Sequence, residues 1–144
     1  MKDYSELFES ILTTQDAISL ESELDQLERA IYKTEIGAQK ALDTLVSKKT
    51  ADAIKDRLLS GEAKKVLAEI RSNLSKLKKI EITIAFEPSQ DSIAKIHEWL
   101  TQNITKDILL DISIDKSIIG GIILVNKGKY VDLSLKTKLH EYFS

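Results

Sequence analysis

The stretch IEITIAF, residues 80–86, divides the sequence into two halves with different periodicities. Its apolar and polar residues alternate, which is typical of a half-buried β-strand. Before it, apolar residues recur every three or four positions, the spacing of amphipathic helices. We therefore expect an α+β protein, with a helical bundle or hairpin over residues 1–78 and a small β/α module over residues 79–144.

The first half is predicted to be helical throughout, since it contains no proline and only two glycines, Gly37 and Gly61. A short amphipathic helix is expected first, with Tyr4, Leu7, Phe8, Ile11 and Leu12 on one face. A long heptad seam follows, which fits either one helix or two helices broken near Gly37. Ser47 or Thr50 is the expected cap of a further helix, and Ser60-Gly61 marks a weak point before a second seam. The first seam contains Ala17, Leu20, Leu24, Leu27, Ile31, Thr34, Ala38, Ala41 and Leu45, and the second contains Ala63, Leu67, Ile70, Leu74 and Leu77.

The second half is predicted to follow the order β-α-β-β-β-α. A helix over residues 87–104 has Pro88 near its start. Residues 107–115 form the next strand candidate, and residues 120–134 contain a strand, an Asn-Lys-Gly turn and a return strand. The helix places Ile93, Ile96, Leu100 and Ile104 on one face, and a closing helix from Asp132 or Ser134 carries Leu135, Leu139, Tyr142 and Phe143.

Composition excludes several classes of function. The formal net charge of −2 does not favour binding of the whole molecule to nucleic acid or to an anionic membrane. The sequence has no cysteine, which excludes disulfides and thiolate sites and suits a reducing compartment. No apolar run approaches the roughly 18–20 residues of a membrane span, and the acidic N-terminus is unlike a secretory signal. We expect a soluble cytoplasmic protein that is held at a membrane only through other proteins.

The polar residues do not form a recognisable catalytic pattern. His97 and His140 have neither a second histidine nor a paired carboxylate at the spacing of a metal site such as HExxH. The serines do not form a GxSxG elbow. Trp99 and Phe86 lack interleaved basic residues and are predicted to anchor the core. We therefore expect no catalytic residue, no cofactor and no bound metal.

Gly120 and Gly121 stand side by side at the start of the most apolar strand. Glycine inside a strand is unfavourable relative to alanine by ~0.5–1 kcal/mol, so the local backbone must require it. Either a bulge or tight link needs a positive φ, or another backbone lies too close for a Cβ atom. A phosphate-binding loop would need more glycines, spaced as GxGxxG or GxxxxGK[ST].

The stretch ISIDKSIIGGIILVNKGKYVDLSLKTKL, residues 112–139, resembles the C-terminal part of the delta subunits of F-type ATP synthases. These are the bacterial counterparts of the mitochondrial oligomycin-sensitivity-conferring protein. The shared pattern is a strand ending in Asp, an apolar pair before Gly-Gly, an apolar strand, and Asp-x-Ser before a closing helix. Residues 80–100 are similar to the strand, link and helix that precede it in the family. The matching residues are Asp115, Ile118, Ile119, Gly120, Gly121, Ile122 to Val125, Asp132, Ser134, Lys136 and Leu139.

The sequence departs from the family at four points. Lys116 replaces a common proline, Leu133 replaces a glycine, and Lys136 replaces an arginine. The fourth difference is length, because the family's N-terminal domain is a six-helix bundle and residues 1–78 are too few for it.

The resemblance implies a non-catalytic stator subunit, which links the catalytic head to the peripheral stalk during proton-driven ATP synthesis. The helical part would bind the N-terminal helices of the alpha subunits, with Tyr4, Leu7, Phe8 and Ile11 as candidate contacts. The β/α module would bind the C-terminal helix of the b subunit. It would act as a monomer in the complex, at the cytoplasmic face of the bacterial membrane. The candidate stalk-side residues are Ile118, Ile119, Gly120, Gly121, Ile122, Leu124, Leu135 and Leu139.

The alternative is a coiled-coil adaptor or regulatory binding module without ATP synthase partners. In that case the heptad seam would form a concentration-dependent dimer through Leu20, Leu24, Leu27 and Ile31. The state of association separates the two hypotheses, since the stator subunit is expected to be a monomer.

Overall fold

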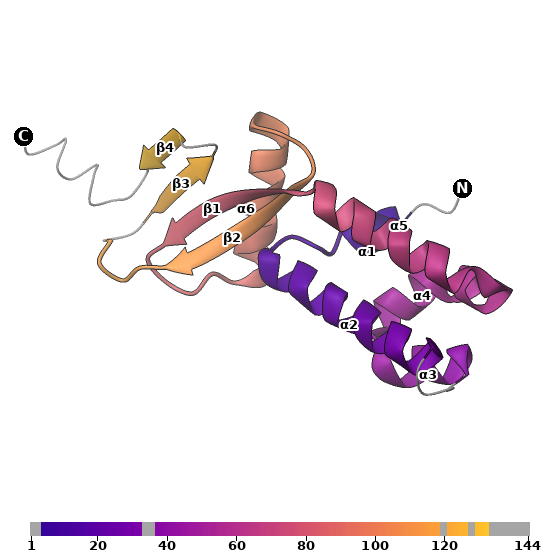
Figure 1. Cartoon of the computed structure of the whole chain (residues 1–144). Coiled ribbons are helices and arrows are strands. Elements are labelled where there is room, and N and C mark those ends of the chain that lie inside the picture. Colours follow the sequence, from indigo (N-terminus) through magenta and orange to yellow (C-terminus); the bar gives the residue numbers. More distant parts are fainter. Residues whose placement is uncertain (1–3, 33–36, 119–120, 127–128, 133–144) are drawn as a thin grey trace, which may run out of the picture. The chain divides into compact units, whose positions relative to one another are not determined.

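A computed structural model describes residues 4–32, 37–118, 121–126 and 129–132 (Figure 1). These residues form helices and a four-stranded sheet, which confirms the α+β class. None of the described helices is long and apolar enough to cross a membrane. The elements are α1 (Ser5–Phe8), α2 (Thr14–Tyr32), α3 (Ala38–Leu45), α4 (Lys48–Arg57), the π-helical turn η1 (Leu58–Glu62), α5 (Ala63–Lys76), β1 (Lys78–Ile84), α6 (Gln90–Asn103), β2 (Ile108–Ile114), β3 (Ile122–Asn126) and β4 (Lys129–Asp132).

The chain divides into two compact units. The helical unit contains the chain up to Ile11 and the segment Gln15–Lys76. The β unit contains Leu12–Thr14 and the chain from Leu77 onward. The short segment Leu12–Thr14 thus belongs to the β unit, although it lies within the half of the sequence that is otherwise helical.

The heptad seam is divided between two helices, as one of the two alternatives predicted. Helix α2 ends at Tyr32, and α3 begins after Gly37, which is its N-cap residue. Within α2 the seam forms the interior of the helical unit, although Ala30 is buried where the seam predicted Ile31, which is half-buried. Ala38 and Leu45 of the seam are half-buried, and Thr34 lies outside the described residues. The buried residues of α2 are Ala17, Leu20, Leu24, Leu27 and Ala30, and those of α5 are Ala63, Val66, Leu67, Ile70 and Leu74.

Two predicted breaks lie where helices end or begin. Ser47 is the N-cap of α4, and its hydroxyl accepts a hydrogen bond from the Thr50 N–H at 3.3 Å. Gly61 lies between α4 and α5 with φ +89°, a left-handed conformation that side chains with a Cβ resist. The chain therefore changes direction between the two helices at the predicted weak point.

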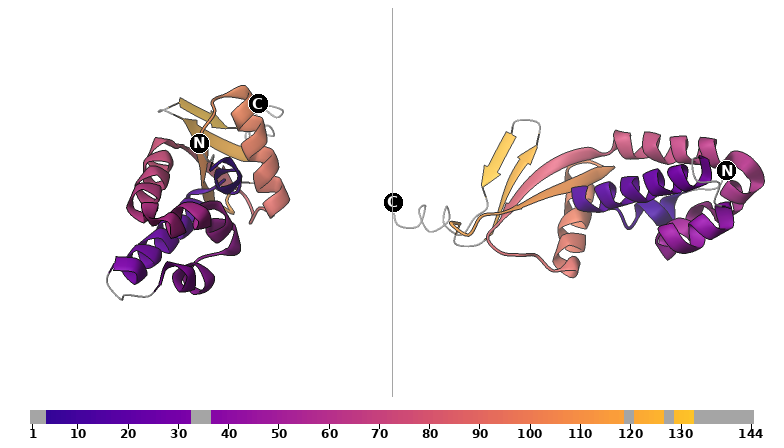
Figure 2. Two further views of the ribbon diagram at one scale, coloured as in Figure 1. Left: turned by 90° about the vertical axis from the view of Figure 1, so that its right-hand side faces the viewer. Right: turned by 60° about the horizontal axis from the view of Figure 1, so that its bottom comes forward.

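The sheet has the strand order β2-β1-β3-β4 (Figures 1 and 2). Strand β1 pairs in parallel with β2 and antiparallel with β3, and β3 pairs antiparallel with β4. Helix α6 connects β1 to β2 and covers one face of the sheet. The order β-α-β-β-β is as predicted, and the predicted closing helix lies outside the described residues. The buried core contains Ile80, Ile82, Ile84, Ile93, Leu100, Ile108, Leu110 and Leu124.

Two details differ from the sequence-based expectation, and a third, the cap of α6, was left open by it. Helix α1 ends at Phe8, and Leu12 does not share its face but packs against the core of the sheet. Ile104 was expected on the buried face of α6, but it follows the last helical residue and is 43% exposed. Ser89 supplies the N-cap of α6, and its hydroxyl accepts a hydrogen bond from the Ser92 N–H at 3.1 Å.

Candidate functional site

The predicted stalk-side residues that the structure describes lie around the start of β3. Ile118 and Leu124 are buried, with 7% and 8% of their surface exposed. Ile122 is half-buried and packs against the core of the sheet. Gly121 is exposed and has φ +81°, so the positive-φ explanation for the glycine pair holds at this residue. Ile119, Gly120, Leu135 and Leu139 lie outside the described residues.

The turn that leads to these residues is built on Asp115. Its N–H donates to the Ile84 carbonyl at 2.9 Å, which extends the pairing of β1 with β2. Its carboxylate accepts a hydrogen bond from the Ser117 N–H at 2.9 Å, a local arrangement that favours a turn. The chain therefore turns immediately before Ile118, whose buried side chain ties the turn to the protein interior.

The register of the sheet brings three isoleucines into one row across three strands. Ile84 on β1 pairs with Ile114 on β2 and with Ile122 on β3. Paired residues point to the same face of a sheet, here the face that α6 covers. Exposure changes along this row, because Ile84 is 3% exposed, Ile122 is half-buried and Ile114 is 42% exposed. We call Ile84, Ile114 and Ile122 the isoleucine row.

Sequence reasoning identified Ile122 but missed Ile114. The signal was present, because Leu110, Ile112 and Ile114 alternate with polar residues to the last position of β2. Trp99 and Phe86 were expected to anchor the core, but they are 52% and 63% exposed, so that expectation was wrong. Trp99 lies on the outer side of α6, and Phe86 follows the end of β1.

The predicted head-side residues are mostly interior residues of the helical unit. Tyr4, Leu7 and Ile11 are 7%, 2% and 8% exposed, and Phe8 is half-buried. Of the four, Phe8 presents the most surface to a partner. Among the described residues of the helical unit, the exposed large apolar side chains are Ile18 and Tyr32 on α2 and Leu59 in η1, with 56%, 54% and 45% of their surface exposed.

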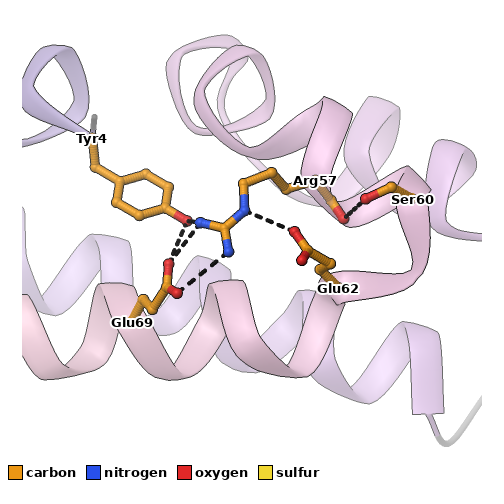
Figure 3. Close-up of polar contacts among 5 residues, drawn as sticks. All are labelled: Tyr4, Arg57, Ser60, Glu62 and Glu69. Atoms are coloured by element: carbon orange, nitrogen blue, oxygen red, sulfur yellow. Dashed lines mark hydrogen bonds and ion pairs between the residues drawn. The ribbon is translucent and has the colours of Figure 1, made fainter. Parts of the chain in front are cut away.

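Tyr4 belongs to a polar cluster that joins the start of the chain to α4 and α5 (Figure 3). Its hydroxyl donates to the Glu69 carboxylate at 3.1 Å and accepts a hydrogen bond from Arg57 Nη1 at 2.5 Å. The Arg57 guanidinium also lies 5.8 Å from the centre of the Tyr4 ring, within the range of a cation–π contact. It forms ion pairs with Glu69 at 2.6 Å and with Glu62 at 3.0 Å.

The cluster changes the acidity of its members. Burial, followed by the hydrogen bond to Glu69, raises the pKa of Tyr4 above its usual value of 10.0. The hydrogen bond from Arg57 lowers the pKa of the Glu69 carboxyl. The guanidinium pKa of Arg57 is raised, chiefly by Glu69. These pKa shifts favour a neutral Tyr4 hydroxyl beside a charged Arg57–Glu69 ion pair. The cluster therefore holds the residue that precedes α1 in place and does not activate a nucleophile.

The described residues do not contain a group of three or more histidine, aspartate, glutamate or cysteine side chains that could hold a metal ion. The Nε2 atom of His97 lies 3.1 Å from the Ile108 carbonyl and so joins α6 to β2. His140 lies outside the described residues.

Comparisons with known proteins agree with one another. The family model described as ATP synthase delta (OSCP) subunit matches residues 39–143. The ATP synthase subunit delta of Azorhizobium caulinodans is 44% identical over 61 residues, which cover 42% of this chain and 32% of that protein. The corresponding subunit of Wigglesworthia glossinidia brevipalpis is 32% identical over 73 residues, 51% of this chain and 42% of that protein. The sodium ion specific subunit delta of Propionigenium modestum is 38% identical over 60 residues, 42% of this chain and 34% of that protein. The matched segments thus span less than half the length of each relative.

Proposed function

The chain belongs to the ATP synthase delta (OSCP) subunit family, and we propose that it is a non-catalytic stator subunit that links the catalytic head to the peripheral stalk. The observation that carries this proposal is the extent of the family match, which runs through residues 39–143 and so includes parts of both units. A subunit that resists torque needs a separate surface for each of two partners. We assign the helical unit to the head and the β unit to the stalk.

We propose that the β unit binds the C-terminal helix of the b subunit at the isoleucine row. An amphipathic partner helix binds by placing its apolar face on an apolar surface. Ile114 supplies the exposed side chain, while Ile84 and Ile122 continue the same apolar surface toward β3. Leu124 lies two residues after Ile122 on the same face, and both Leu124 and Ile118 are buried.

The helical unit is proposed to hold the N-terminal helices of the alpha subunits. Tyr4, Leu7 and Ile11 are buried, so they would act by fixing α1, and Phe8 would make the contact. In this role the protein would lie at the cytoplasmic face of the membrane, held there by the complex, and the proton-driven chemistry would belong to the assembled synthase.

The alternative, an adaptor that dimerises through the heptad seam, has less support. Leu20, Leu24 and Leu27 are 3%, 0% and 0% exposed within the single chain, and Ile31 is half-buried. A dimer through this seam would require the helical unit to open, with the loss of its own core. The burial of these leucines supports a monomer.

Capture of partners by the tagged chain tests the proposal. The tagged protein is purified from solubilised membranes of its own organism, and the subunits bound to it are identified by mass spectrometry. Recovery of alpha and b together is the expected result. Recovery of neither, with a dimer in light scattering, would contradict the stator role.

Two matched variants test the stalk surface. Ile114→Asp places a charge on the isoleucine row, whereas Ile104→Asp places the same charge at a residue of nearly equal exposure, 43% against 42%. We expect Ile114→Asp to weaken recovery of b by at least about tenfold, the effect of losing ~1.4 kcal/mol in binding. Ile104→Asp should leave recovery of b unchanged. Equal loss in both variants would reject the isoleucine row as the binding surface.

A further inference from the structure

We infer that Leu12–Thr14 couples the stability of the helical unit to the pairing of this segment with the edge of β2. The segment belongs to the β unit, but the chain immediately before it and immediately after it belongs to the helical unit. The backbone therefore enters the β unit for three residues and leaves it again before α2 continues. This inference concerns the chain alone and does not depend on any partner subunit.

The backbone pairing of this segment is made at the outer edge of β2. Thr13 forms a parallel bridge with Leu110, and the Leu110 N–H donates to the Leu12 carbonyl at 2.9 Å. The Thr14 hydroxyl donates a hydrogen bond to the Asp111 carboxylate at 3.4 Å. The Leu12 side chain packs against the core of the sheet. The segment thus covers part of an edge strand, where backbone groups would otherwise lack a partner in the sheet.

The segment Gln15–Lys76 is consequently anchored at both ends in the same sheet. At one end Thr14 lies beside β2, and at the other Lys78 begins β1 and donates its N–H to the Asp107 carbonyl at 2.8 Å. A segment fixed at two points has fewer accessible conformations than one fixed at a single point, which lowers the entropy cost of keeping it in place.

The pairing is too small to persist alone. The hydrogen bonding of so short a pairing contributes little against the entropy of ordering those residues. The folded helical unit supplies what is missing, because it orders the residues on both sides of the segment in α1 and α2 and so leaves the segment fewer conformations to lose when it pairs with β2. Leu7, 2% exposed, and Tyr4 fix α1 in that unit. Opening of the helical unit should therefore release the Leu110 N–H to solvent, although Leu110 belongs to the β unit.

Amide hydrogen exchange, followed by NMR on the full chain, tests this coupling. Leu7→Ala destabilises the helical unit, and Leu59→Ala is the matched control, because Leu59 is 45% exposed in the same unit. In Leu7→Ala we expect exchange at Leu110 to accelerate by at least about tenfold, in step with the amides of α5. In Leu59→Ala it should stay near the wild-type rate. Tyr4→Phe serves as a milder second variant if Leu7→Ala does not fold.

Two amides of the β unit provide the internal reference. The Lys78 N–H donates to Asp107 and the Asp115 N–H donates to Ile84, and neither bond involves the segment Leu12–Thr14. We expect both amides to accelerate clearly less than Leu110. An unchanged Leu110 rate would mean that the β unit holds the segment by itself, and equal acceleration at all three amides would mean that the chain opens as one body. Either result would overturn the inference.

Discussion

The carboxylate of Glu23 on α2 accepts a hydrogen bond from the hydroxyl of Thr50 on α4, with 2.5 Å between the two oxygens. The two residues are 27 positions apart in the sequence, so this bond joins the two helices. The Ser47 hydroxyl reaches the same carboxylate at 3.3 Å. A negative charge is therefore placed at the N-terminus of α4, where the N–H groups of a helix favour it. Thr50 is only 2% exposed, so the bond is largely shielded from water on its side.

Thr50→Val should lower the free energy of unfolding by about 1 to 2 kcal/mol, because valine keeps the shape of threonine but leaves the carboxylate without this donor. Urea unfolding measures the effect. Thr44→Val is the matched control, since Thr44 is exposed and donates only to the Lys40 carbonyl within its own helix. It should change stability by less than about 0.5 kcal/mol. Equal losses of stability in the two variants would show that the hydrogen bond between Thr50 and Glu23 does not contribute to the free energy of unfolding.

Tyr4 should make stability fall at alkaline pH. Its pKa is raised by burial and by the bond to Glu69, so the folded protein holds the phenolic proton more tightly than the unfolded chain. The contribution is complete below pH 10.0 and is lost as the pH rises through the folded pKa. Tyr4→Phe should be less stable near neutral pH by about 1 kcal/mol, and its difference from the wild type should shrink above pH 10.0.

Urea unfolding of Tyr4→Phe and the wild type across this alkaline range measures the difference directly. Tyr32→Phe is the control, because the Tyr32 side chain is 54% exposed, and near neutral pH it should change stability by less than about 0.5 kcal/mol. A constant difference between Tyr4→Phe and the wild type above pH 10.0 would contradict the role given to burial of the hydroxyl.

Glu69 should act in the opposite pH range. Arg57 lowers the pKa of its carboxyl below the usual 4.5, so the folded protein binds this proton less tightly than the unfolded chain. The stabilising contribution is present above pH 4.5 and is lost as the pH falls through the folded pKa. Glu69→Gln should therefore be less stable than the wild type near neutral pH, and thermal unfolding should show the two converging in acid. Glu21→Gln, at an exposed position of α2, is the control that should not reproduce this convergence.

Local periodicity predicted most of the fold because burial of one face sets the spacing of apolar residues. The alternation in residues 80–86 predicted β1, and the three-four spacing of Leu20, Leu24 and Leu27 predicted the interior of the helical unit. The limits of prediction lie in contacts between distant residues. Leu12 fits the stripe of α1 by spacing, yet it packs on the sheet, where its carbonyl accepts a hydrogen bond from Leu110, a residue far along the chain.

The candidate site shows the same limit. An apolar residue at the correct spacing is predicted equally well as core or as contact surface, and only the packing distinguishes the two. Leu124 is buried and Ile114 is exposed, although both lie on strands that pair with β1 and both point to the same face of the sheet. Charged residues carry even less local signal, so the joining of Tyr4, Arg57 and Glu69 was not foreseen.

Gly61 and Gly37 differ in what they require of the backbone, and alanine should reveal the difference. Neither glycine has an atom within 4 Å of the place a Cβ would take, so space is not the obstacle at either position. Gly61 has φ +89°, where an L-residue with a Cβ is strained by about 1 to 2 kcal/mol, whereas Gly37 has φ −57°.

We therefore expect Gly61→Ala to lower the free energy of unfolding by about 1 kcal/mol or more, because the reversal between α4 and α5 must keep its left-handed residue. Gly37→Ala should cost clearly less, since alanine is a poorer N-cap residue than glycine but restricts the unfolded chain without straining the folded one. Urea unfolding of the two variants side by side measures both effects. A Gly61→Ala variant as stable as Gly37→Ala would mean that the residue at position 61 can adopt a right-handed backbone conformation. In that case the glycine would not determine where α4 ends and α5 begins.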